Sequence, residues 1–264
     1  MHVKNIWNMA SLSVVLIVKN EEETLENALI DLDWCDEIII VDSNSTDATL
    51  DIAKKYTDKI FQYPDWQGFG VQRQRAQSHA SSDWALMLDA DERITPALQN
   101  AIQQVITENN QDNVYALPRL SWVFGRFIRH GGWYPDYVIR LYPRSKAAYG
   151  DEKVHEKLHF PESMQVRKLT GDLLHYTYRD LEHYLVKSAN YAAAWSEQRE
   201  LKGKKTSLLQ GFSHGLVCFI RMYLLRLGFL DGRQGLLLAM LSAHSTFVKY
   251  ADLWVKRQEK NYSK

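Results

Sequence analysis

Short apolar runs alternate with amphipathic segments over the first half of the chain. Residues 12–18 (LSVVLIV) and 37–43 (EIIIVDS) are continuous apolar runs rich in β-branched side chains. Such runs are typical of strands buried on both faces of a parallel sheet. Residues 21–32 lie between them and carry apolar side chains at helical spacing, at Leu25, Ala28, Leu29 and Leu32. The pattern predicts a strand–helix–strand unit.

The same alternation continues to about residue 110. Residues 43–56 predict a second helix, with Ser45 or Thr46 as its N-cap. Residues 95–106 predict a further helix, because Thr95 can cap it and a proline occupies its first position. Two more strands are predicted at residues 59–64 and 84–90. Together these elements predict an open α/β sheet.

The pattern changes after residue 113. Residues 114–172 are rich in aromatic residues, Gly and Pro, with short strands such as 137–143, which predicts a site-building region at the edge of the sheet. Residues 180–200 predict a helix, and the basic segment KGKK follows at 202–205. From residue 206 on, two apolar helices are predicted, with a break near GFLDGRQG.

Charge is distributed unevenly, although the formal net charge of the 264-residue chain is zero. Residues 1–100 carry 17 acids and 8 bases, whereas residues 201–257 carry 9 bases and 2 acids. This asymmetry indicates that the C-terminal part contacts an anionic surface. Because the basic part is also the most apolar, we expect a membrane surface and no nucleic acid.

Residues 208–230 are long and apolar enough to resemble a membrane span. They contain His214, Arg221 and Arg226, and an arginine at the bilayer centre costs roughly 2.5–3.5 kcal/mol. We therefore expect an interfacial helix, with KGKK against anionic headgroups, and a peripheral rather than an integral protein. The alternatives are a buried helical subdomain and a dimer interface.

Two observations bear on the compartment. Cys35 and Cys218, the two cysteines, form neither a disulfide framework nor a zinc-ligand spacing, which favours a reducing compartment. The apolar run at 12–18 is short, and charged KNEEE follows it in place of a small-residue cleavage site. No signal peptide is expected, and the expected localisation is cytoplasmic.

Acidic residues follow three of the predicted strands, which end in VKNEE, VDSNSTD and LDADE. Ligands of open α/β sheets bind at the carboxyl ends of the strands, so these acids mark one site. Their mutual repulsion calls for a cation or for hydrogen-bond donors. Mg²⁺ or Mn²⁺ takes such oxygen ligands together with substrate phosphates. Neither GxGxxG nor GxxxxGK[ST] occurs, so a dinucleotide site and a P-loop are not expected.

The ordered set SVVLIVKNEE, IIIVDSNSTDAT and WALMLDADE resembles family 2 glycosyltransferases, which have the GT-A fold. The later segments GGWYPDYVIRLYP, VHEKL and LRLGFLDGRQGLLLAMLSAHSTFVKYADLW are similar to a subgroup that includes lipopolysaccharide inner-core β-1,4-glucosyltransferases. The resemblance extends from Leu12 to Trp254. It implies a GT-A-type, Rossmann-like open α/β sheet with a C-terminal helical membrane-associating extension.

The resemblance assigns roles to the acids at the sheet edge. Asn20 and Glu21 match the first-strand edge that approaches the nucleotide. Asp42 matches the acid that hydrogen-bonds uracil or ribose. Asp89 matches the sugar or ribose contact, and Asp91 matches the ligand of a Mg²⁺ or Mn²⁺ ion that bridges the diphosphate.

A further nucleotide contact is implied in FGVQRQRAQ, where relatives often have a Lys-Gln-Lys-Asn core. Arg73 fits this core, whereas Val71 and Gln74 depart from it. Arg75 is the alternative contact, and a solvated helix face is the other interpretation of both arginines.

The reaction needs a carboxylate base for the acceptor hydroxyl. Glu156 is preferred, because VHE occupies the position of an acceptor-side acid in the subgroup, and Asp136 is the alternative. His155 can orient Glu156 or contact phosphate. Trp133 and Tyr134 are expected to bind the acceptor as a stacking platform, or else to be core aromatics.

The resemblance thus implies metal-assisted, in-line, inverting transfer of a hexose, glucose in the subgroup, from a UDP-sugar. The implied acceptor is a lipid-linked saccharide such as heptose of the lipopolysaccharide inner core. The enzyme would be peripheral on the cytoplasmic face of the inner membrane. Residues 10–120 would bind the nucleotide sugar, 121–200 would form the acceptor part, and 201–264 would be the membrane-associated extension.

Three rival functions remain open from the sequence. They are a DxD-type phosphohydrolase, a sugar nucleotidyltransferase and a non-catalytic membrane-surface nucleotide-binding protein. The phosphohydrolase motif would follow the first strand and carry a Thr or Val, whereas DADER follows the fourth. The nucleotidyltransferase would need a glycine-rich loop that KNEEETLEN lacks. The non-catalytic function would need the acids to bind without a base.

Overall fold

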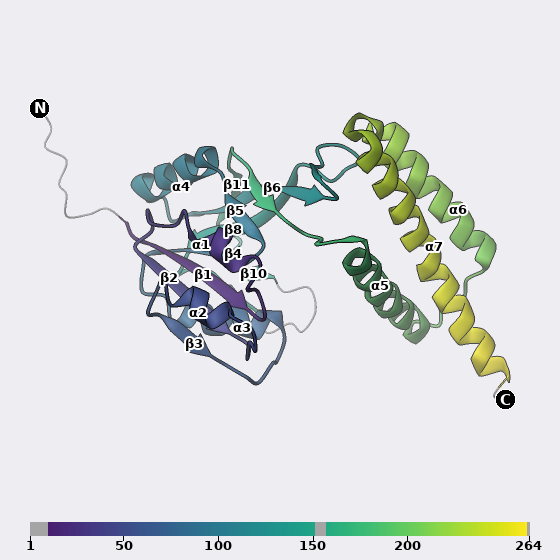
Figure 1. Ribbon diagram of the computed structural model, residues 1–264, viewed down its shortest axis with the longest axis horizontal. Coiled ribbons are helices and arrows are strands. Elements are labelled where there is room, and N and C mark those ends of the chain that lie inside the picture. Colours follow the sequence, from purple (N-terminus) through teal and green to yellow (C-terminus); the bar gives the residue numbers. More distant parts are fainter. Residues whose placement is uncertain (1–9, 151–156, 263–264) are drawn as a thin grey trace, which may run out of the picture. The chain divides into compact units, whose positions relative to one another are not determined.

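The computed structural model describes residues 10–150 and 157–262 (Figure 1). They form two compact units. The sheet unit contains the described residues up to Arg119 and those from Asp136 to His175. The helical unit contains Leu120–Pro135 and the described residues from Tyr176 on.

Four parallel strands form one half of the main sheet, in the order β3-β2-β1-β4. The apolar residues of β1, β2 and β4 are almost all buried, as expected for strands covered on both faces, whereas those of the edge strand β3 are half-buried. In β1, Val14 and Leu16 belong to one core cluster and Val15 belongs to another. The bounds are β1 Leu12–Val18, β2 Glu37–Asp42, β3 Ile60–Gln62 and β4 Trp84–Asp89.

Antiparallel strands complete the sheet on the β4 side, in the order β8-β6-β12-β5. Strands β11 and β7 also pair with β6, and β9 and β10 form a separate hairpin. The bounds are β5 Glu92–Ile94, β6 Asn113–Val123, β7 Arg126–Phe127, β8 Asp136–Pro143, β9 Ala148–Tyr149, β10 Leu158–His159, β11 Gln165–Lys168 and β12 Leu173–His175.

The first two helices of the sheet unit are shorter than the sequence pattern predicts. The predicted N-cap of the second helix is wrong, because α2 begins after Ala48 while Ser45 and Thr46 lie in the loop. The predicted cap of α4 is confirmed, since the Thr95 side chain accepts the Leu98 N–H. The bounds are α1 Leu25–Leu29, α2 Thr49–Ala53, α3 Phe69–Ser78 and α4 Pro96–Glu108.

The helical unit contains three long helices, visible as α5, α6 and α7 in Figure 1. Helix α7 packs against both α5 and α6. Asp180 caps α5 by accepting the His183 N–H at 2.7 Å, and a Ser207–Gln210 capping box begins α6. The bounds are α5 Leu181–Leu201, α6 Leu208–Phe219, the π-helical turn η2 Ile220–Leu225, the 3₁₀ turn η3 Gly228–Asp231 and α7 Gly232–Tyr262.

The expected fold class is confirmed: an open α/β sheet is followed by a helical C-terminal extension. Among the described helices, one segment, Leu208–Leu225, is long and apolar enough to cross a membrane by length and composition. Only 11% of this segment is buried inside the protein.

Candidate active site

Strand register gathers the predicted acids at one edge of the sheet. Asp42 ends β2 and is paired with Val18 at the end of β1, while Asp89 ends β4 and is paired with Ile17. The two carboxylates therefore flank the carboxyl end of the central strand. This is the edge at which open α/β sheets bind ligands.

Asp89 is held between two arginines from different elements. Its Oδ1 accepts a hydrogen bond from Arg73 Nη2 of α3 at 2.8 Å, and its Oδ2 accepts one from Arg140 Nη2 of β8. Burial alone would raise the pKa of Asp89, but the charges of Arg140 and Arg73 hold it well below its usual range. Asp89 is thus an ionised carboxylate with both oxygens engaged.

Glu92 supports the turn that carries the acids. Its side chain is fully buried, accepts the Asp89 N–H at 3.0 Å, and pairs with Arg140 at 2.9 Å. Burial raises the pKa of Glu92, against the lowering effect of Arg140. Arg119 approaches the same carboxylate at 3.8 Å. Because the Glu92 carboxylate is bonded to groups inside the protein, this residue shapes the site and does not face a ligand.

Asp91 lies two residues after Asp89 and is about as accessible, with side chains 31% and 28% exposed. Its Oδ2 lies 3.3 Å from Nε2 of His175, the last residue of β12. Within the described part of the chain, no group of three or more His, Cys, Asp or Glu residues could hold a metal ion. A carboxylate and an imidazole fit a divalent ion whose remaining ligands come from phosphate and water.

The loops after β1 and β2 are tied together by the residues predicted to meet the nucleotide. Asn20 Oδ1 accepts the Thr46 N–H at 2.8 Å, and the Glu21 N–H donates to the Thr49 hydroxyl at 2.7 Å. Asp42 is fully buried and accepts the N–H groups of Asn44 and Ser45 at 3.0 and 3.1 Å. Asp42 therefore shapes the loop, and its contact with a nucleotide stays a prediction.

The two candidate arginines of α3 differ in their partners. Arg73 is buried and points to Asp89, so the solvated-face interpretation is wrong for it. Arg75 instead pairs with Asp65 at 2.6 Å and lies over the Tyr63 ring. Gln74, which departs from the family pattern, donates to the Tyr149 carbonyl at 2.7 Å. The structure thus brings Arg73, and not Arg75, to the acids.

The candidate bases are placed differently. Asp136 begins β8, and its Oδ2 accepts two hydrogen bonds from Arg119, at 3.0 Å from Nε and 2.6 Å from Nη2. Glu156 and His155 lie outside the described residues.

The predicted acceptor aromatics belong to the helical unit. Trp133 is half-buried and packs against the cluster of Val123, Ile128, Tyr184 and Leu238. The Arg129 guanidinium lies over the ring of Tyr134, 5.1 Å from its centroid.

Three residues of the site were missed in the sequence: Arg119, Arg140 and His175. Arg140 had a readable signal, because an arginine inside the apolar run VIRLY must find a partner to be buried. His175 ends β12 without such a signal and Arg119 lies inside β6, and strand pairing brings both to the acids.

Comparison with known proteins agrees with this geometry. The family described as "Glycosyl transferase family 2" matches residues 13–174, more than half of the chain. The lipopolysaccharide core biosynthesis glycosyltransferase LpsC of Rhizobium meliloti is 28% identical over 257 residues, which cover 91% of this chain and 93% of LpsC. An uncharacterized glycosyltransferase of Rickettsia prowazekii is 27% identical over 255 residues, covering 93% and 87%.

Among solved structures, S. aureus TarS 1–349 in complex with UDP covers 95% of this chain and 92% of its own, at 16% identity and a TM-score of 0.48. Glucosyl-3-phosphoglycerate synthase of Mycobacterium tuberculosis, in complex with Mn²⁺, UDP-glucose and phosphoglyceric acid, covers 44% and 45% at 23% identity and a TM-score of 0.36. By the match over residues 13–174, the chain belongs to glycosyl transferase family 2 and is a glycosyltransferase.

Proposed function

We propose that the protein transfers a hexose, glucose by its resemblance, from a UDP-sugar to a saccharide acceptor with inversion. The observation that carries this proposal is the acidic sheet edge, where Asp42 and Asp89 flank β1 and the partly exposed Asp91 follows two residues after Asp89. The name of the LpsC relative supports a lipopolysaccharide core saccharide as the acceptor, and heptose of the inner core follows from the subgroup resemblance.

Asp91 and His175 would hold a Mg²⁺ or Mn²⁺ ion. Asp91 Oδ2 and His175 Nε2 lie 3.3 Å apart, which supports binding of one ion by both side chains. When bound, the ion supplies Lewis-acid stabilisation to the leaving diphosphate. Arg73 and Arg140 keep the carboxylate of Asp89 ionised beside the donor, so that it can accept hydroxyl hydrogen bonds from the sugar or ribose. Asn20, Glu21 and Asp42 would form the nucleotide side of the site.

Glu156 would take the proton of the acceptor hydroxyl as that oxygen attacks the anomeric carbon. Asp136 is the alternative base. Its Oδ2 already accepts two hydrogen bonds from Arg119, which supports a positioning role for this acid. Trp133, Tyr134 and His155 are the proposed acceptor contacts.

The acceptor would be a lipid-linked saccharide, and the enzyme would work peripherally on the cytoplasmic face of the inner membrane. The basic, apolar C-terminal part supports this location, since it carries the charge that anionic headgroups attract. Family membership supports sugar transfer over the phosphohydrolase, nucleotidyltransferase and non-catalytic alternatives.

The test is a transfer assay with purified protein, UDP-glucose and heptose-terminated core lipid. Product mass spectrometry should show the addition of one hexose, and product NMR should show a β-glycoside, because in-line attack on an α-linked donor inverts the anomeric centre. An α-glycoside would overturn the mechanism. If UDP-galactose supported transfer and UDP-glucose did not, the assignment of the sugar would be wrong, but the proposed transfer reaction would stand.

A further inference from the structure

The helical unit exposes large apolar side chains over several consecutive elements. Leu209 is 77% exposed, Phe212 62% and Leu225 74%, and these values are far above those of core residues. Leu216 of α6, Phe229 of η3 and Met240 of α7 are also exposed. Large exposed apolar side chains on several consecutive elements favour an interaction site over a solvated face.

Helix α6 meets α7 through its smallest residues. Gly211 and Gly215 are the buried residues of α6. A Cβ added at Gly211 would lie 2.9 Å from Cβ of Tyr250, and one at Gly215 would lie 3.0 Å from the Ala243 carbonyl oxygen. The helices therefore approach closely through glycines, while the leucines and Phe212 of α6 are exposed. In a water-soluble helix pair the large apolar side chains lie between the helices, whereas here the glycines lie between them. This arrangement resembles helix packing in lipid.

The charges around this surface are of one sign. Arg221, Arg226 and Arg233 are exposed among its apolar side chains. Asp231 is an acid of the same segment, but it is only 1% exposed. The surface thus presents apolar groups and guanidinium groups together, which complements the acyl chains and phosphates of an anionic bilayer.

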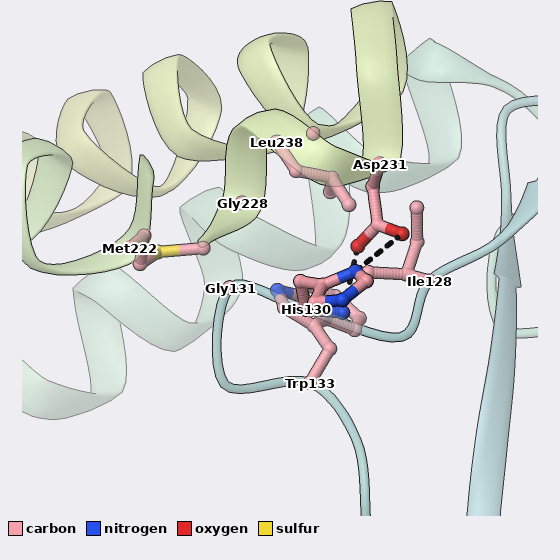
Figure 2. A pocket seen from close by; sticks show the side chains of 9 residues that line it. Ile128, His130, Gly131, Trp133, Met222, Gly228, Asp231 and Leu238 are labelled. Carbon is pink, nitrogen blue, oxygen red and sulfur yellow. Dashed lines mark hydrogen bonds and ion pairs between the residues drawn. The ribbon is translucent and has the colours of Figure 1, made fainter. Parts of the chain in front are cut away.

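Asp231 also favours an interfacial position over a membrane span. Its carboxylate accepts the His130 N–H at 2.7 Å and the Arg129 N–H at 3.3 Å, and Figure 2 shows it beside His130. Arg126 in addition donates to the Leu230 carbonyl at 3.3 Å. If α6 crossed the bilayer, this attached polar segment, which follows the apolar stretch Leu208–Leu225, would have to be carried through the hydrocarbon to the far side, at a high cost in free energy.

We propose that the exposed apolar face of α6, η2, η3 and the first turns of α7 docks on an anionic phospholipid bilayer. Its apolar side chains would lie at the boundary between headgroups and acyl chains, and Arg221 and Arg233 would contact lipid phosphates. The proposal deepens the membrane association proposed above. It is tested by binding alone, so docking and sugar transfer can each fail without the other.

The experiment is co-sedimentation of the full chain with phosphatidylcholine vesicles, with and without phosphatidylglycerol. Leu209→Glu and Phe212→Glu should each raise the lipid concentration for half-binding by on the order of tenfold or more, since each removes an apolar side chain that would be buried in the bilayer. The matched control is Ile30→Glu in the sheet unit, where Ile30 is 60% exposed, and it should leave binding unchanged. Circular dichroism verifies that the variants fold.

The electrostatic part is tested on the same vesicles. Arg221→Gln and Arg233→Gln should each weaken binding to the anionic vesicles by about fivefold, from roughly 1 kcal/mol per basic residue, and leave the neutral ones unaffected. Unchanged binding of both glutamate variants would overturn the proposal. If wild-type protein in membranes resisted alkaline carbonate extraction, this would indicate a membrane span and would also overturn the proposal. The proposal would likewise fail if the wild type did not bind vesicles but formed a lipid-free dimer that Phe212→Glu dissociates, because a second copy would then cover the face.

Discussion

Replacing Arg140 with methionine tests whether buried ion pairs hold the acidic turn in place. Methionine fills a similar volume but leaves Asp89 and Glu92 without the guanidinium that they share. Breaking a buried pair costs about 3–5 kcal/mol because an uncompensated charge remains. Asp89 keeps Arg73, and Glu92 keeps Arg119 at 3.8 Å, so we expect about 3 kcal/mol, the lower end of that range.

The loss should depend on pH, with a sign that follows from the two pKa shifts. The pKa of Asp89 is depressed by Arg140 and Arg73 against the effect of burial, so its ionisation stabilises the fold above the unfolded value of about 3.9. The pKa of Glu92 is raised by burial, so its ionisation costs stability as the pH rises through about 4.3. Loss of Arg140 weakens the first effect and enlarges the second. The deficit of the variant should therefore be larger at pH 8 than at pH 5.

The assay is urea unfolding of both proteins at the two pH values, followed by tryptophan fluorescence. Arg167→Met on the exposed strand β11 is the control, and it should change the free energy of unfolding by less than about 0.5 kcal/mol. The double variant Arg140→Met with Glu92→Gln should recover part of the loss, because it removes one buried charge. A loss below about 1 kcal/mol at pH 8, or an equal loss at both pH values, would refute the ion-pair reasoning.

Two further predictions concern the site. Asp42→Ala should weaken UDP binding roughly ten- to over a hundredfold, from a lost charge-assisted hydrogen bond of about 1.5–3 kcal/mol, and calorimetric affinity within twofold of wild type would exclude the contact. Glu156→Gln should retain donor affinity and lower turnover by about 10²–10⁴-fold, with Asp136→Asn as the comparison. If Asp136→Asn abolishes transfer while Glu156→Gln is nearly normal, the two acids exchange roles.

The parallel half of the sheet could be predicted because its strands carry a local signal. Residues 12–18 and 84–89 are apolar and buried on both faces, so composition alone indicates strands in a sheet covered on both sides. Helix α3 has no such signal, since Gln72 and Arg73 are among its buried residues. Local patterns therefore specify the scaffold better than they specify polar helices that line a site.

Only the acidic residues of the site could be predicted from the sequence. Asp42, Asp89 and Asp91 follow strands that could be recognised, so their common edge could be expected from the sequence. Arg140 and His175 come from the antiparallel half, and their neighbours are decided by which strands pair with which. The sequence next to these residues carries no signal of such long-range strand pairing. For the same reason the partner of Asp136, which is Arg119 across the β6–β8 register, could not be foreseen.

Calorimetric titration of UDP with and without Mn²⁺, on wild type and Asp91→Ala, tests most directly that this edge is a metal-assisted nucleotide-sugar site. Wild-type affinity should rise with Mn²⁺, and the rise should vanish in Asp91→Ala and diminish in His175→Ala, because these two side chains would hold the ion. Asp58→Ala is the control, since Asp58 is an exposed acid that precedes β3 and should leave the Mn²⁺ effect intact. An undiminished Mn²⁺ effect in Asp91→Ala would contradict the assignment of the site.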